Sequence, residues 1–285
     1  MRSRYGISIG NILHPTDFSH GSDVAFAHAL RLALDAKGKL EILHVHRERE
    51  AAEWDNYPSV RDTLCKWKIL PPHAQKSEVA RLGVNISKSA CTGANPAAGV
   101  LDHLERRGAD LVVMATHRRE GIDRWLHSNL AESISTKSDA ASLFVPFGVD
   151  GFVDPDSGAV SLDRILIPID KSPDPQATVD AVADLVNAIG PEHVDIRLLH
   201  IGDPSGMPSP TLPVSDKCRW VWDTRLGSPV EAICNDADEF NADLIAMTTS
   251  GHDGFLDVLR GSTTERVLQR AKCPVLSVHA DRESS

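Results

Sequence analysis

Short apolar runs alternate along the chain with longer segments whose apolar residues recur at helical spacing. In the first half, residues 23–37 carry such spacing up to Gly38, and residues 96–107 run from Pro96 to a stop at Gly108. The short runs predict strands at 11–14, 40–46, 84–89, 111–115 and 143–145, and a further helix is expected at 128–137. Strands that alternate with helices predict a parallel sheet with helices on both faces.

The same order of elements returns in the second half of the chain. Strands are expected at 164–167, 194–201, 242–247 and 275–278, and helices at 178–189, ended by Gly190, and from Pro229 onward. The first copy is longer only at residues 47–83, a polar stretch with prolines in which we expect one or two short helices. We therefore predict two domains, at residues 1–147 and 163–285, joined by a linker at 148–162.

The stretch from Met247 to Arg266 has the features of a phosphate-binding loop. An apolar run at 242–247 predicts a buried strand, Gly251 and Gly261 follow it, and Ser262 begins a predicted helix. The unpaired N–H groups of a first helical turn favour an anion, and glycine lets the backbone approach it closely. The alternative is a strand-to-helix loop with an ordinary Ser/Thr cap.

The predicted topology brings other residues to this loop. Ligands of open parallel sheets bind beyond the carboxyl ends of the strands, where the strand order reverses. Asp170 and Ile201, which follow or end two neighbouring strands, should therefore converge with residues 248–263. Asp170 has a second interpretation, as a helix N-cap or the start of an Asx turn, and the two roles are compatible.

The spacing of Gly251, nine residues, Gly261 and Ser262 resembles the nucleotide-binding signature of the universal stress protein family, Gly-x-x-Gly-x9-Gly-Ser/Thr. Thr248 stands in the first glycine position, and a β-branched residue there would disfavour a positive φ. Residues 165–170 and 261–278 also resemble the family, so the resemblance covers almost the whole chain as two copies. It implies an α/β fold with two tandem five-stranded parallel sheets of the Rossmann-like, adenine nucleotide alpha hydrolase-like type.

The resemblance also implies a ligand and the residues that hold it. The ligand would be ATP with Mg²⁺ or Mn²⁺, with Asp170 and Ile201 on the adenosine side and the glycine loop on the ribose and phosphates. The nucleotide-binding residues implied are Pro168, Ile169, Asp170, Ile201, Met247, Thr248, Gly251, Gly261, Ser262 and Thr263.

The first copy departs from this signature at each glycine position. Its matching residues are Ala115, Arg118, Ser128 and Asn129, and the Arg118 side chain would fill space that phosphates need. We expect this copy to have lost ATP binding, although the cation could bind another anion.

Single-copy members of this family pair through their last strands. The resemblance thus implies that residues 143–145 and 275–278 meet in an intramolecular pseudo-dimer, which covers edges that would otherwise invite aggregation. A further homodimer stays open.

Nine of the 13 histidines fall in the first copy. Those expected near strand ends are His14, His46, His117 and His127, and neutral imidazoles that converge there could bind zinc. No H-x-x-x-H pattern supports a site, and His44 has a counterpart in His200, so scattered surface and hydrogen-bonded histidines are the plainer interpretation.

Composition excludes several classes of function. The 285 residues carry a net charge of −10 and no Lys/Arg block, which argues against nucleic acid or an anionic membrane as main partner. Five scattered cysteines without a C-x-x-C pair indicate a reducing cytoplasm. The first ten residues lack an apolar signal core, and no run of about 18 apolar residues predicts a membrane span.

Sequence motifs of ATP-using enzymes and hydrolases do not stand in the places where they would act. A G-x-S-x-G pattern occurs at residues 6–10, but it precedes the first predicted strand and so cannot form the strand-to-helix elbow of a hydrolase. No Walker lysine follows the glycines, and the loops PTDFS and PIDKS lack the glycines that adenylating relatives of this fold carry there. The resemblance, together with these observations, implies a cytoplasmic ATP-binding protein with a regulatory role and at most slow hydrolysis. The alternatives are a nucleotide-free interaction scaffold and an anion or metal sensor built on the first copy.

Overall fold

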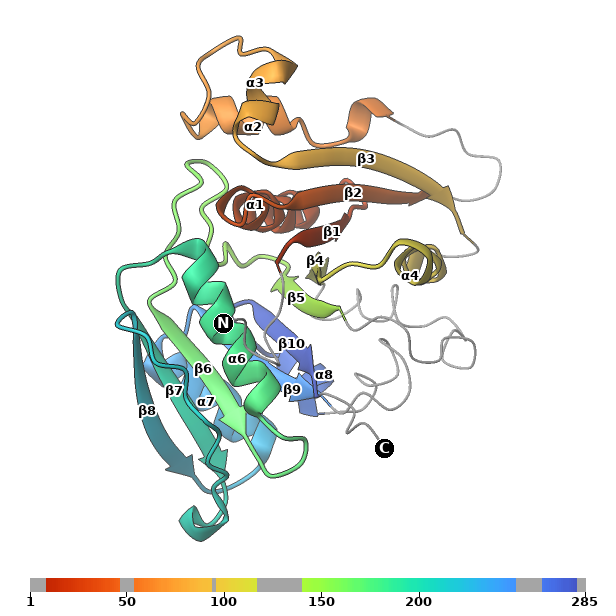
Figure 1. The fold of residues 1–285 in the computed structure, drawn as a ribbon. Coiled ribbons are helices and arrows are strands. Elements are labelled where there is room, and N and C mark those ends of the chain that lie inside the picture. The colour runs from red at the N-terminus through yellow and green to blue at the C-terminus, as the bar shows by residue number, and fades with distance from the viewer. Residues whose placement is uncertain (1–8, 47–53, 94–95, 117–139, 250–262, 281–285) are drawn as a thin grey trace.

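Ten strands in the part of the chain that the structure describes form one sheet, which extends through both halves (Figure 1). The computed structural model describes residues 9–46, 54–93, 96–116, 140–249 and 263–280. Its strand order is β3-β2-β1-β4-β5-β10-β9-β6-β7-β8. The strands are β1 (Asn11–Pro15), β2 (Lys39–His46), β3 (Asn85–Thr92), β4 (Leu111–Thr116), β5 (Ala141–Pro146), β6 (Arg164–Ile169), β7 (Val194–Ile201), β8 (Cys218–Arg225), β9 (Leu244–Thr249) and β10 (Val275–His279).

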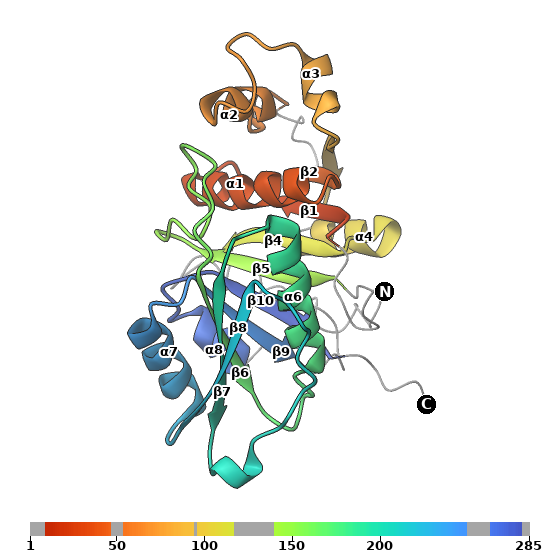
Figure 2. The same ribbon diagram turned by 60° about the vertical axis from the view of Figure 1, so that its left-hand side comes forward.

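Helices cover both faces of this sheet, as the alternating pattern predicts. On one face, α1 (His20–Asp35) and α6 (Gln176–Ile189) pack over the buried side chains of both halves in one apolar cluster. On the other face lie α4 (Pro96–Arg107), α7 (Pro229–Phe240) and α8 (Thr263–Leu268), whose apolar residues form the second cluster (Figure 2). The segment between β2 and β3 adds η1 (Trp54–Asn56), α2 (Val60–Lys66) and α3 (Lys76–Arg81), and η3 (Pro204–Gly206) follows β7.

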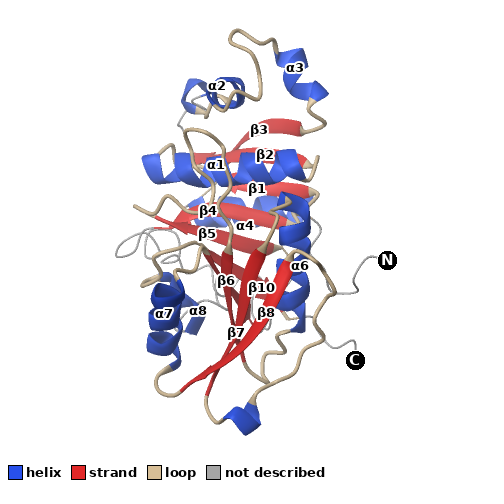
Figure 3. Ribbon diagram, turned by 90° about the vertical axis from the view of Figure 1, so that its left-hand side faces the viewer, coloured by secondary structure: helices blue, strands red, loops and turns tan. Residues whose placement is uncertain are grey.

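The two halves repeat one topology and join through their last strands. The order β3-β2-β1-β4-β5 is matched by β8-β7-β6-β9-β10, and every strand pair within a half is parallel. β5 and β10 pair antiparallel, with Leu143 opposite Leu276 (Figure 3). The predicted intramolecular pseudo-dimer is confirmed.

Most predicted elements lie within a few residues of their observed bounds, and two points differ. The sequence did not predict β8, whose alternation Arg-Trp-Val-Trp belongs to a half-exposed strand. Helix α1 begins earlier than the predicted residue 23, because Ser19 caps it by accepting a hydrogen bond from Ser22 N. The helix predicted at 128–137 lies outside the described residues.

The predicted linker at 148–162 contains no helix, but it is packed into the first half rather than free. Phe152 and Val153 are fully buried, and their backbone N–H groups donate to Nε2 of His28 in α1 at 3.1 and 3.2 Å. Trp67 Nε1 donates to Pro155 O at 3.1 Å. These contacts make the segment part of the core around α1.

His28 holds this segment as a neutral base. Since Nε2 accepts two N–H donors, the ring proton lies on Nδ1, which is 2.9 Å from Val24 O. Burial lowers the pKa of His28 from 6.5 to about 4, so the ring stays neutral at neutral pH.

Candidate functional site: the strand ends of the second half

The carboxyl ends of β6 and β9 form the point where strand order reverses in the second half. β6 lies between β9 and β7. From β6 the chain continues to β7 and β8 on one side, and then crosses to β9 on the other side. Seven predicted site residues lie at the carboxyl ends of β6, β7 and β9 or at the start of α8: Pro168, Ile169, Asp170, Ile201, Met247, Thr248 and Thr263. The other three, Gly251, Gly261 and Ser262, lie outside the described residues.

Asp170 is exposed directly after β6 and is not a helix cap. Its Oδ1 accepts a hydrogen bond from Lys171 N at 2.7 Å. Helix α6 has Pro175 at its N-cap, and Asp174 accepts a hydrogen bond from Gln176 N. The N-cap interpretation of Asp170 is therefore wrong, and the carboxylate stands at the strand end that the topology makes a binding edge.

Thr248 occupies its glycine position without backbone strain. It lies inside β9, where φ is extended, and is not among the described residues with positive φ. Its Oγ1 lies 2.6 Å from Oγ1 of Thr178, which is completely buried in α6. The hydroxyl of Thr248 is thus turned toward the helix.

His200 connects the ends of two neighbouring strands, a role that the sequence does not predict. His200 Nδ1 lies 3.3 Å from Ile169 O, which fixes the end of β6 against the end of β7. His44 makes the same contact in the first half, with Nδ1 2.8 Å from Thr16 O. The Leu-His pair that both halves share at residues 43–44 and 199–200 is the sequence feature that could have indicated this role.

The backbone beyond β7 comes close to the His200 ring. Gly202 has φ +150°, and a Cβ there would lie 3.1 Å from His200 Nε2. A larger residue would push the ring from its position, so glycine keeps this turn tight.

The matching strand ends of the first half are covered by aromatic rings. Phe18, with φ +62°, stacks on His44 at 4.2 Å between ring centroids and meets Tyr57 edge-on at 5.3 Å. Tyr57 comes from the segment after β2, and its hydroxyl donates to Ser89 O at 2.5 Å. In the second half, Lys171 stands at the position of Phe18 and is exposed. The halves therefore differ in more than their glycine loops.

The candidate metal ligands do not assemble among the described residues. His14 is buried in β1 with Nδ1 2.9 Å from Val113 O, and burial lowers its pKa to about 4. His46 ends β2, whereas His117 and His127 lie outside the described residues. Within the described part of the chain, no group of three His, Cys, Asp or Glu side chains could hold an ion.

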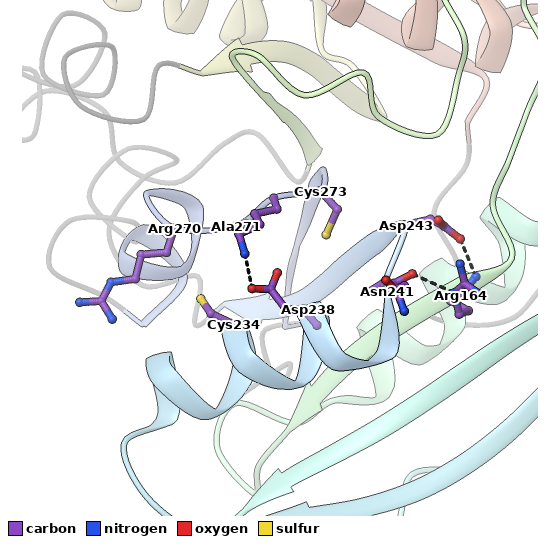
Figure 4. A pocket seen from close by; sticks show the side chains of 11 residues that line it. Arg164, Cys234, Asp238, Asn241, Asp243, Arg270, Ala271 and Cys273 are labelled. Atoms are coloured by element: carbon purple, nitrogen blue, oxygen red, sulfur yellow. Dashed lines mark hydrogen bonds and ion pairs between the residues drawn. The ribbon is translucent and has the colours of Figure 1, made fainter.

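A pocket of about 290 Å³ lies at the opposite, amino edge of β6, β9 and β10 (Figure 4). Its carboxylates already have partners: Asp238 pairs with Lys272, and Asp243 accepts Asp163 N and Arg164 N at 2.8 Å. Burial raises the pKa of Cys273 to about 12, which keeps that thiol protonated. The pocket is separate from the predicted nucleotide edge.

Comparison with known proteins agrees with this architecture. The model of the universal stress protein family matches residues 8–146 and 218–279, more than half of the chain. A universal stress protein of Synechocystis is 29% identical over 138 residues, which are 42% of this chain and 88% of that protein. One of Methanocaldococcus jannaschii is 46% identical over 52 residues, and this match spans 18% of the chain and only 31% of that protein.

A solved structure covers both halves at once. The crystal structure of a universal stress protein from Archaeoglobus fulgidus aligns with 99% of this chain and 100% of its own, at a TM-score of 0.58 and 18% identity. At that identity the likeness concerns the fold. No helix in the described residues is long and apolar enough to cross a membrane. With a family match over both halves and this shared fold, the chain belongs to the universal stress protein family.

Proposed function

We propose that this protein is an ATP-binding regulatory protein that holds one nucleotide, at the strand ends of its second half. The observation that carries the proposal is the difference between equivalent strand ends. Phe18 stacks on His44 and meets Tyr57 over the strand ends of the first half, whereas the second half has the exposed Lys171 at the position of Phe18 and so no ring there. The second half also carries the Gly251-x9-Gly261-Ser262 spacing.

In this proposal each part of the edge has a separate role. Asp170 offers an acceptor to the ribose or adenine, and Ile201 offers an apolar surface. Gly251, Gly261, Ser262 and Thr263 surround the phosphates with backbone N–H groups and hydroxyls. Thr248 contributes its backbone, because its hydroxyl is paired with Thr178.

Mg²⁺ or Mn²⁺ would enter with the nucleotide. Both are hard cations that prefer oxygen ligands, and among the described residues of this edge Asp170 is an exposed carboxylate. The phosphate oxygens would therefore provide most of the coordination and the ion would neutralise their charge. We assign no residue a catalytic role, and any hydrolysis would be slow.

The domain organisation is part of the same proposal. Residues 1–147 form the nucleotide-free domain and residues 163–285 the nucleotide-binding domain, and residues 148–162 connect them while packing on α1. The five free cysteines support a reducing, cytoplasmic location.

The direct test is to identify what the native protein carries. Purified full-length protein is denatured, and the released small molecules are analysed by mass spectrometry. We expect an adenine nucleotide, near one per chain. If the released fraction contains none, and added ATP does not bind either, the nucleotide-free scaffold becomes the better account.

A further inference from the structure

The sheet has two end strands, β3 and β8, and their outer edges differ. Among the described residues β8 pairs only with β7, and it lies at the outside of the molecule in Figure 1. Val194 N donates to Lys217 O and Gly202 N donates to Arg225 O. The N–H and C=O groups of the odd-numbered residues of β8 therefore face β7. In a parallel ladder the alternate residues, Cys218, Trp220, Trp222 and Thr224, then point N–H and C=O outward. At the two ends of the strand these groups already have partners, since Cys218 N donates to Ser215 O at 3.4 Å and Thr224 N to Asp223 Oδ1 at 2.8 Å. The open part of the edge is therefore Trp220 to Trp222.

The pseudo-symmetry allows the two edges to be compared residue by residue. His44 and His200 make equivalent contacts, so Lys88, opposite Ile42, corresponds to Trp222, opposite Leu198. By the same register Ser87 corresponds to Val221. A central lysine is a common protection against pairing of sheet edges.

The β8 edge lacks this protection. Val221 and Trp222 are 38% and 39% exposed, respectively. Within the described part of the chain, the outward N–H and C=O groups of Trp220 and Trp222 have no backbone partner. An open strand edge with exposed apolar side chains is a template for another strand.

We propose that β8 pairs antiparallel with β8 of a second copy of this chain, about a two-fold axis through Val221. Residues whose N–H and C=O groups point away from β7 must lie opposite residues of the same kind in the second copy. The two-fold axis must therefore pass through a residue and not between two residues. Centring on Val221 sets Trp220 opposite Trp222 of the second copy and Arg219 opposite its Asp223. Aromatic pairs and opposite charges across strands both stabilise such a ladder.

Neighbouring registers are less complementary. Centring on Trp222 would set Arg219 opposite Arg225, and centring on Trp220 would set Arg219 opposite Val221. Arg219 already pairs with Asp195 at 2.6 Å, and its side chain is 63% exposed, so the guanidinium can also reach across the interface. Asp223 likewise accepts Thr224 N and Arg225 Nη1 on Oδ1, at 2.8 and 2.9 Å, so the contact across the interface would add a second partner to each group. The charges therefore set the register, while the backbone ladder and the tryptophans provide the contact.

This dimer does not depend on nucleotide binding, and sedimentation velocity without nucleotide tests it. The parent protein should shift from monomer to dimer between about 1 and about 100 μM. Val221→Lys would bring two lysines together on the axis and should weaken association at least tenfold. Val214→Lys is the matched control, because Val214 is fully exposed just before β8, and it should behave like the parent. A parent that stays monomeric, or a Val221→Lys variant that associates equally well, overturns the proposal.

A cross-linking experiment tests the register. Residues on the axis of an antiparallel, non-hydrogen-bonded pair have Cα atoms about 4.5 Å apart, within disulfide reach. In Val221→Cys, two thiols should form one S–S bond and give two electrons to added copper(II), releasing two protons. Leu226 is 82% exposed against 38% for Val221 but lies off the axis, so Leu226→Cys should cross-link no more than the parent with its five native cysteines. Failure of Val221→Cys to cross-link, or equal cross-linking of Leu226→Cys, contradicts the register.

Discussion

Thr248 shows how a residue can depart from a family signature without straining the backbone. A glycine position suggests a need for positive φ, yet this one lies at the end of a regular strand. The hydroxyl that threonine adds is taken up by Thr178 at 2.6 Å. Sequence alone showed the departure but not its partner, because Thr178 is 70 residues away in a different helix.

The pair gives a prediction that separates stability from binding. Thr248→Val should change ATP affinity by less than about threefold, because the hydroxyl faces α6 rather than a ligand. It should lower the free energy of unfolding by about 1–2 kcal/mol, because it leaves the buried Thr178 hydroxyl without its partner. Calorimetry and urea unfolding measure the two effects.

The double variant Thr178→Val/Thr248→Val is the control, and it should recover most of the lost stability, since both polar partners are removed. A tenfold loss of affinity in Thr248→Val with unchanged stability would show instead that the hydroxyl contacts nucleotide.

His28 makes the stability of the protein depend on pH. Its pKa in the folded protein is about 4, below the ordinary 6.5, because burial disfavours the charged ring. As pH falls from about 6.5 to about 4, the unfolded chain gains this proton and the folded chain does not, so stability decreases by about 3 kcal/mol. His14, with the same lowered pKa, adds a similar loss.

Urea unfolding across this window checks the assignment. Between pH of about 6.5 and about 4, the free energy of unfolding of His28→Gln should decrease by about 3 kcal/mol less than that of the parent, because one titrating group is gone. Parallel curves for the two proteins would mean that His28 is not the buried neutral base described above.

Among the elements, the helices and central strands were the most predictable. Helix α6 follows its apolar spacing and ends at Gly190, which has φ +75° as a C-cap glycine should. Strand β8 was missed because it is an edge strand, with tryptophans and arginines in place of a buried run. The β-propensity of a residue predicts a strand least well where the strand is half exposed, because it depends on packing against neighbours.

The connecting segment at 148–162 shows a second limit of sequence reasoning. Its glycines, aspartates and proline predict a loop, and the backbone is irregular as expected. Its burial depends on His28, more than 120 residues earlier, and on Trp67 of the segment between β2 and β3. No local pattern encodes such contacts.

Packing of this segment can be tested at Phe152, which is fully buried against His28 with ring centroids 4.7 Å apart. Phe152→Ala should lower the free energy of unfolding by about 3–5 kcal/mol, the usual cost of an aromatic cavity. Phe147→Ala is the matched control, because that ring is 43% exposed, and it should cost about 1 kcal/mol. If urea unfolding shows equal losses for the two variants, residues 148–162 connect the halves without packing into the core.

For the whole molecule, the repeat predicted how the halves join but not how they differ in structure. The pairing of β5 with β10 follows from two equivalent last strands on one chain. The covering of the first half's strand ends needs a left-handed backbone at Phe18 and a ring from Tyr57. Tyr57 lies in the segment that the second half lacks, so comparing the two copies could not reveal it.

The central claim is that the second half alone binds ATP, and calorimetric titration of the full-length protein with ATP and Mg²⁺ tests it most directly. We predict one binding event per chain in the parent, none in Gly261→Val, and an unchanged event in Ser128→Val, the matching position of the first half. Thermal melts confirm that each variant is folded. Binding that survives Gly261→Val, or is lost only in Ser128→Val, would contradict the account.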